Sequence, residues 1–118
     1  MGNPIRMNST VTVRPDQVEA FRQVAKDFAA RVEAEDHDTL GYAYFENEDG
    51  TEFRILEVHK DEAAIRTHLE HAKPHTRRFI EASEKTVIEV CGALTGELRK
   101  EIESWGVAIY RPVAGFTR

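Results

Sequence analysis

The chain has little of several features that would each direct it to a particular class of protein. Its single cysteine, Cys91, excludes an intrachain disulfide framework and suits a reducing cytoplasm. No apolar run approaches the length that spans a bilayer, and the N-terminus has no apolar segment of the signal-peptide kind. A formal net charge of -5 argues against bulk electrostatic binding to nucleic acid or to an anionic membrane. We therefore expect a cytoplasmic protein with neither a nucleic-acid nor a membrane partner.

What the sequence does contain is the composition of a single folded domain. Of its 118 residues, 41% are hydrophobic and 31% are charged, which is typical of a globular chain with one modest core. It has no internal repeat, no low-complexity segment and no linker-like stretch. We assign residues 5–95 to the main unit and residues 96–118 to a C-terminal helix-strand extension of the same domain.

The first elements follow from apolar periodicity. Residues 5–13 alternate between two faces, as in a half-buried strand. One face carries Ile5, Met7, Ser9, Val11 and Val13, and the other carries Arg6, Asn8, Thr10 and Thr12. Seven apolar residues at helical spacing from Val18 to Val32 then predict a helix with one buried side.

The remaining elements predict an α+β fold. Further strands are expected over residues 42–47, 52–59, 86–94 and 107–110, with a short helix over 96–105. Asp49-Gly50 supplies the turn of a hairpin, Asp61 caps a second long helix, and Pro74 predicts a break or kink in that helix. This order of elements is typical of a ferredoxin-like split βαβ arrangement, followed by a C-terminal helix and a short strand.

The most informative segment runs from Glu57 to His68. It is expected to be a strand end, a cap and two helical turns that place a histidine on the inner face. Together with the opening strand and helix and the hairpin, it makes roughly residues 5 to 95 resemble the antibiotic biosynthesis monooxygenase (ABM), or quinol monooxygenase-like, family. That family often has a tryptophan, a polar cap, an alanine, two histidines and a phenylalanine. The matching residues here are Ala63 or Ala64, His68, His75 and Phe79, with His59 in place of the tryptophan.

The resemblance implies that two such domains pair into a dimeric α+β barrel. It also implies an oxygenase that uses neither metal nor flavin and acts on electron-rich phenols, quinols or anthrone-like rings. The same family equally admits relatives that degrade haem, isomerise small lactones or have no demonstrated activity. We therefore expect a homodimer with a small aromatic partner and no cofactor. The alternative is a haem- or small-molecule-binding dimeric module without turnover, with His68 or His75 as an axial ligand.

His68 is the first candidate for catalysis, because an imidazole can take a phenolic proton and leave an anion that reacts with oxygen. Asn8 and Tyr44 are expected to position the oxygenated intermediate. The residues expected to contact the substrate are Tyr42, His59, His75 and Phe79.

Each of these assignments has a plainer alternative. His68 could be satisfied by a backbone or carboxylate partner, and Asn8 is a surface residue if its strand face is solvated. The spacing of His68, His71 and His75 could suit zinc, but Pro74 interrupts that stretch and no carboxylate second shell is evident. We therefore predict no metal site.

Overall fold

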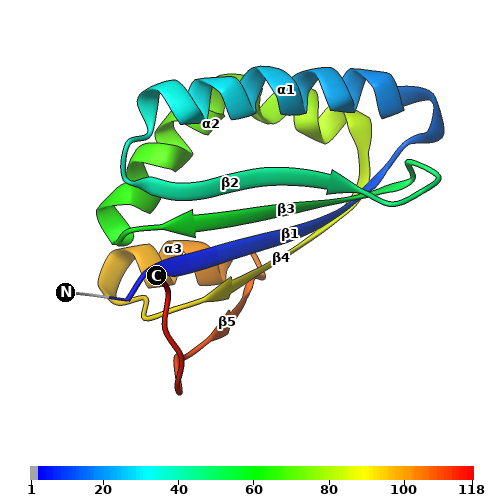
Figure 1. The fold of residues 1–118 in the computed structure, drawn as a ribbon. Coiled ribbons are helices and arrows are strands. Elements are labelled where there is room, and N and C mark those ends of the chain that lie inside the picture. Colours follow the sequence, from blue (N-terminus) through cyan, green and yellow to red (C-terminus); the bar gives the residue numbers. More distant parts are fainter. Residues whose placement is uncertain (1–2) are drawn as a thin grey trace.

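One five-stranded sheet and three α-helices make up residues 3–118, the part of the chain that the computed structural model describes (Figure 1). In chain order the elements are β1 (Ile5–Val13), the 3-10 turn η1 (Pro15–Gln17), α1 (Val18–Glu35), β2 (Thr39–Glu46), β3 (Glu52–His59), α2 (Glu62–Ala82), β4 (Ser83–Cys91), α3 (Gly96–Ser104) and β5 (Ala108–Tyr110). The strand order is β2-β3-β1-β4-β5, with β1 antiparallel to β3 and β4, and β5 parallel to β4. The predicted ferredoxin-like split βαβ fold with a C-terminal helix and strand is confirmed.

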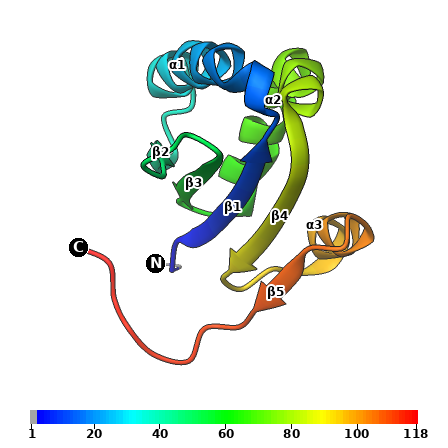
Figure 2. The same cartoon turned by 90° about the vertical axis from the view of Figure 1, so that its right-hand side faces the viewer.

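The two long helices lie on the same face of the sheet, as Figures 1 and 2 show from two directions. The alternation in β1 matches this layering, because the apolar set that begins with Ile5 is buried and the other set is exposed or half-buried. Asn8 belongs to the second set, so its side chain lies on the face that the helices leave uncovered.

Of the break or kink predicted at Pro74, the break is wrong. Helix α2 is continuous from Glu62 to Ala82 with Pro74 inside it. Pro74 is exposed, while His68 and Phe79 on either side of it face inward. Packing of the inner face against α1 and the sheet therefore holds the helix together across a residue that cannot donate its amide. The predicted cap at Asp61 is confirmed, because its carboxylate accepts a hydrogen bond of 2.9 Å from the backbone N–H of Ala64.

The core consists of two apolar clusters on the covered face. Ile5, Met7, Ile65, Val90, Leu94, Leu98 and Ile102 form the first, and Val11, Val13, Phe21, Phe53, Ile55 and Ala82 form the second. Leu98 and Ile102 bring α3 into the first cluster, so the C-terminal helix packs on the same core as the main unit. No helix among residues 3–118 is both long enough and apolar enough to cross a membrane.

Candidate functional site

The inward face of β3 changes from apolar to ionisable along the strand. Its buried positions are Phe53, Ile55, Glu57 and His59, which share one face because side chains alternate along a strand. Glu57 is 7% exposed and His59 is 0% exposed. Because unpaired buried charges are costly, these two residues must find polar partners inside the protein. They find each other first: His59 Nε2 lies 2.8 Å from Glu57 Oε1.

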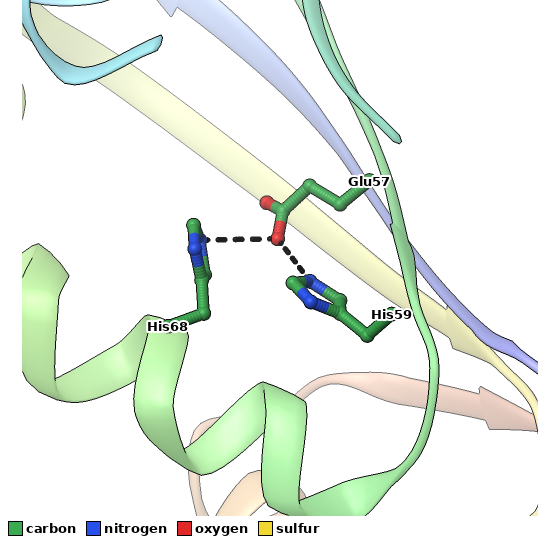
Figure 3. A group of neighbouring side chains, drawn as sticks. All are labelled: Glu57, His59 and His68. Carbon is green, nitrogen blue, oxygen red and sulfur yellow. Dashed lines mark hydrogen bonds and ion pairs between the residues drawn. The ribbon is translucent and has the colours of Figure 1, made fainter. Parts of the chain in front are cut away.

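His68 joins this pair from α2 (Figure 3). It follows Ala64 and Ile65 on the buried side of the helix and is 4% exposed. His68 Nε2 lies 3.2 Å from Glu57 Oε1, and its Nδ1 lies 3.1 Å from Asp36 Oδ2. The imidazole of His68 is therefore held between two carboxylates. A carboxylate partner for His68 is one of the alternatives that the sequence left open.

Asp36 and Thr39 extend these contacts at the junction between α1 and β2. Asp36 follows the last residue of α1 and is 4% exposed, and its second oxygen contacts His71 Nδ1. Thr39 Oγ1 lies 3.0 Å from His59 Nδ1. We call the connected set the acid–imidazole network; its members are Asp36, Thr39, Glu57, His59, His68 and His71.

Two tyrosines of β2 lie beside the network. The hydroxyls of Tyr42 and Tyr44 are 2.6 Å apart, and the Tyr42 ring centroid is 5.2 Å from that of His68. Burial raises the pKa of Tyr42, with a further contribution from Tyr44, and burial likewise raises the pKa of Tyr44. Both phenols therefore stay protonated near neutral pH. When one donates to the other, the second keeps its proton for a further acceptor.

The aromatic neighbours complete an inner wall. Phe79 stacks on Tyr44 with ring centroids 6.3 Å apart and planes 5° apart. Phe28 contacts Phe79 and His75, with centroids 6.2 Å and 4.7 Å away. The structure thus brings together His68, Tyr44, Tyr42, His59, His75 and Phe79 from the predicted site. Asn8 is not among them, because it lies on the opposite face of the sheet.

The network meets the surface at a hollow of about 400 Å³ between the end of α1 and the start of β2. Asp36, Thr39 and Tyr42 line this hollow, while Glu57, His59 and His68 are not part of its wall. A second hollow of about 180 Å³ also includes Asp36 and Thr39 and continues to the first turns of α2. A small molecule in the larger hollow would therefore meet the network at Asp36 and Thr39.

His75 is a predicted site residue whose polar atoms are buried without a partner in the part of the chain that the structure describes. Both of its ring nitrogens are buried without a hydrogen bond among the described residues. Burial, with the nearby charges of Arg31 and Arg78, lowers the pKa of His75 below its ordinary value of 6.5. The ring is therefore kept neutral in the folded chain, stacked against Phe28.

Replacing His75 with phenylalanine is expected to raise the free energy of unfolding by about 1 kcal/mol, because it removes unsatisfied buried polar atoms and keeps the ring. The gain should grow below pH 6.5. There the unfolded chain protonates His75 while the folded chain resists it, so the native protein loses stability that the variant keeps. Urea unfolding at about pH 7.5 and about pH 5.5 checks this. The exposed His37→Phe is the control, and equal acid sensitivity of native chain and His75→Phe would contradict the prediction.

Four members of the network are absent from the sequence-based site, and one of them, His71, was considered only as a zinc ligand. Asp36 looks like part of an acidic helix end, Glu57 like the edge of a strand face, and Thr39 like a loop residue. A signal for Glu57 was present: it continues the buried alternation of Phe53 and Ile55, where a carboxylate needs a partner. The zinc trio considered from the sequence is not assembled, since His68 and His71 both contact Asp36 and His75 packs on Phe28.

Comparison with solved structures shows the same fold in proteins of low sequence identity. MupZ from Pseudomonas fluorescens superimposes with a TM-score of 0.86 at 18% identity, covering 98% of this chain and 95% of that one. PA3566 from Pseudomonas aeruginosa gives 0.70 at 23% identity over 80% and 98% of the two chains. Rv0793 from Mycobacterium tuberculosis gives 0.70 at 19% identity over 80% and 99%. The likeness to MupZ thus extends into the C-terminal segment.

Sequence comparison identifies the family. No curated protein matches the chain at a significant level. The sequence profile of the family named Antibiotic biosynthesis monooxygenase, however, matches residues 4–82, which is well over half of the chain. The chain therefore belongs to the antibiotic biosynthesis monooxygenase family.

Proposed function

We propose that this protein is a monooxygenase that acts on a small electron-rich aromatic molecule such as a quinol, a phenol or an anthrone-like ring, and that it needs no flavin. Membership of the family supports oxygenase chemistry. The observation that carries the proposal is the acid–imidazole network, which ends at the wall of the 400 Å³ hollow beside two protonated tyrosines.

The network has room for one more proton. It contains five polar contacts: Thr39–His59, His59–Glu57, Glu57–His68, His68–Asp36 and Asp36–His71. With both carboxylates ionised and all three imidazoles neutral, the Thr39 hydroxyl and one N–H from each ring supply only four protons. The fifth proton belongs on His68, whose two nitrogens both face carboxylate oxygens. A proton taken from a substrate would therefore complete the hydrogen bonding of the site.

The proposed mechanism uses the position on His68 that can accept this fifth proton. A substrate hydroxyl in the hollow meets Asp36, and its proton passes through that carboxylate to His68. The resulting electron-rich anion reacts with dioxygen, and the free proton of the Tyr42–Tyr44 pair hydrogen-bonds the oxygenated intermediate. For an anthrone-like ring, one oxygen atom becomes the new carbonyl and the other leaves as water with the two displaced hydrogens. This balance needs no external reductant.

We also propose that the protein works as a homodimer. Three large apolar side chains, those of Phe45, Leu56 and Val87, are 54%, 43% and 53% exposed in the single chain. Leu56 and Val87 lie opposite Asn8 and Thr10 on the uncovered face of the sheet, and Phe45 pairs with Arg54 on that same face. Pairing of two such faces would cover this apolar surface and give Asn8 a buried setting away from His68.

Oxygen uptake by chelator-treated protein with a panel of quinols and anthrone-like phenols tests the activity. We expect uptake above the non-enzymatic background with at least one compound. His68→Ala should lower kcat by about 10²–10⁴-fold, because it removes the proton acceptor. Glu70→Ala, an exposed change on the same helix, is the matched control and should keep native activity. Uptake that stays at background with every compound would overturn the activity and favour the binding-module alternative.

A further inference from the structure

We infer that Glu57, His59 and His68 form a binding site for a divalent transition-metal cation of the zinc type. This site is distinct in kind from the proton acceptor proposed above, and the inference does not rest on the proposed oxygenase activity. It concerns the same buried side chains because two imidazoles and one carboxylate are also a common metal donor set.

The three donors already converge. Each residue offers one ligand atom, and these atoms all lie within 4.8 Å of one another (Figure 3). Glu57 Oε1 lies 2.8 Å from His59 Nε2 and 3.2 Å from His68 Nε2. In tetrahedral geometry, metal–ligand bonds of about 2.0–2.2 Å place neighbouring ligand atoms about 3.3–3.6 Å apart. The side chains are therefore close to the separation that a bound cation imposes, and all three are buried.

The outer contacts orient both imidazoles for metal binding. His59 Nδ1 lies 3.0 Å from Thr39 Oγ1, and His68 Nδ1 lies 3.1 Å from Asp36 Oδ2. A ligating histidine almost always donates its second ring N–H to a carboxylate, a carbonyl or a similar acceptor, which fixes the other nitrogen as the ligand. Here that arrangement leaves both Nε2 atoms free for the cation. Asp36, 32 residues before His68 in the sequence, supplies the carboxylate that orients the His68 ring.

The charges of the buried carboxylates also favour a divalent cation at this site. Glu57 and Asp36 are 7% and 4% exposed, so their ionised forms place two negative charges in the interior. A divalent cation held by Glu57 and hydrogen-bonded through His68 to Asp36 neutralises both. Three protein ligands also leave a coordination position for water or a small molecule, as metal sites with a chemical role do.

Titration of chelator-treated protein with Co²⁺, followed by visible absorption, and with Zn²⁺, followed by calorimetry, tests the site. We expect a single cation per chain. Glu57→Gln and His59→Gln should each weaken binding by more than about 100-fold, and Asp36→Asn by about 10–100-fold. His37→Gln, which removes an exposed imidazole outside the site, should bind as the native chain does. Circular dichroism confirms that each variant is folded.

The result is decisive even where a variant fails to fold. In the native protein, Zn²⁺ should shift the ring nitrogen resonances of two histidines and leave those of His37 and His75 unchanged. Absence of Co²⁺ and Zn²⁺ binding by the native chain would overturn the inference, as would binding that Glu57→Gln and His59→Gln leave intact. Oxygen uptake is a separate readout: because the cation occupies His68 Nε2, Zn²⁺ should inhibit it, and only this inhibition depends on the proposed function.

Discussion

Replacing Phe28 with alanine is expected to lower the free energy of unfolding by about 3–5 kcal/mol. Phe28 is 2% exposed and lies at the centre of the inner wall, with its ring centroid 5.7 Å from Tyr42, 5.4 Å from His68 and 4.7 Å from His75. Its removal leaves a cavity lined by rings of β2 and α2, which are fixed in the sheet and in a long helix, so the surroundings can collapse only partly. The midpoint of urea unfolding should fall accordingly.

Phe28→Ala should also affect the candidate site. The Phe28 ring contacts His75, whose nitrogens lack partners, as well as the Tyr42 and His68 rings. Water entering the new cavity would find polar atoms to bind, which loosens the position of His68. The matched control is Phe116→Ala, because that ring is 77% exposed and should change stability by less than about 0.5 kcal/mol. Equal losses for the two variants would show that the inner wall is not a packed core.

Two strands, β1 and β3, were predictable from local sequence because buried and more exposed side chains alternate along them. The spans of β1 and β3, Ile5–Val13 and Glu52–His59, agree with the predicted alternation and with the turn chemistry of Asp49-Gly50. The periodic faces of β2, β3 and α2 also explain why six of the predicted site residues lie together. The start of β4 at Ser83 was missed, because the strand follows α2 directly and its first residues carry no apolar signal.

The partners of the site could not be derived in the same way. The contact between His68 and Asp36 joins the end of α1 to the middle of α2, and no local pattern encodes that crossing. Pro74 illustrates the converse: a strong local rule gave a break, and packing on either side of the residue overrode it. Local sequence thus predicts which face of a strand or helix carries a side chain. Only the tertiary structure determines which buried ionisable side chains contact one another.

A double-mutant cycle on Glu57 and His59 is expected to show strong coupling in chelator-treated protein. Glu57→Leu should cost about 3–5 kcal/mol, because it leaves the buried Nε2 atoms of His59 and His68 without an acceptor. His59→Leu should cost less, about 1–3 kcal/mol, since Glu57 keeps its contact with His68. In the double variant the His59 ring is absent, so only His68 Nε2 is left without an acceptor. The combined loss should therefore be about 1–3 kcal/mol smaller than the sum of the single losses.

The exposed ion pair of Arg31 and Glu35 supplies the control cycle. Its atoms are 2.9 Å apart, close to the 2.8 Å between Glu57 and His59, but its side chains are 43% and 46% exposed, so solvent screening should hold its coupling below about 0.5 kcal/mol. Coupling at Glu57 and His59 no larger than in this pair would mean that the buried groups are satisfied independently. In that case a proton or a cation bound at one of these side chains would not change the energy of the other. Strong coupling is what both proposed occupants of the site require, because each must exchange with protons shared along the whole network.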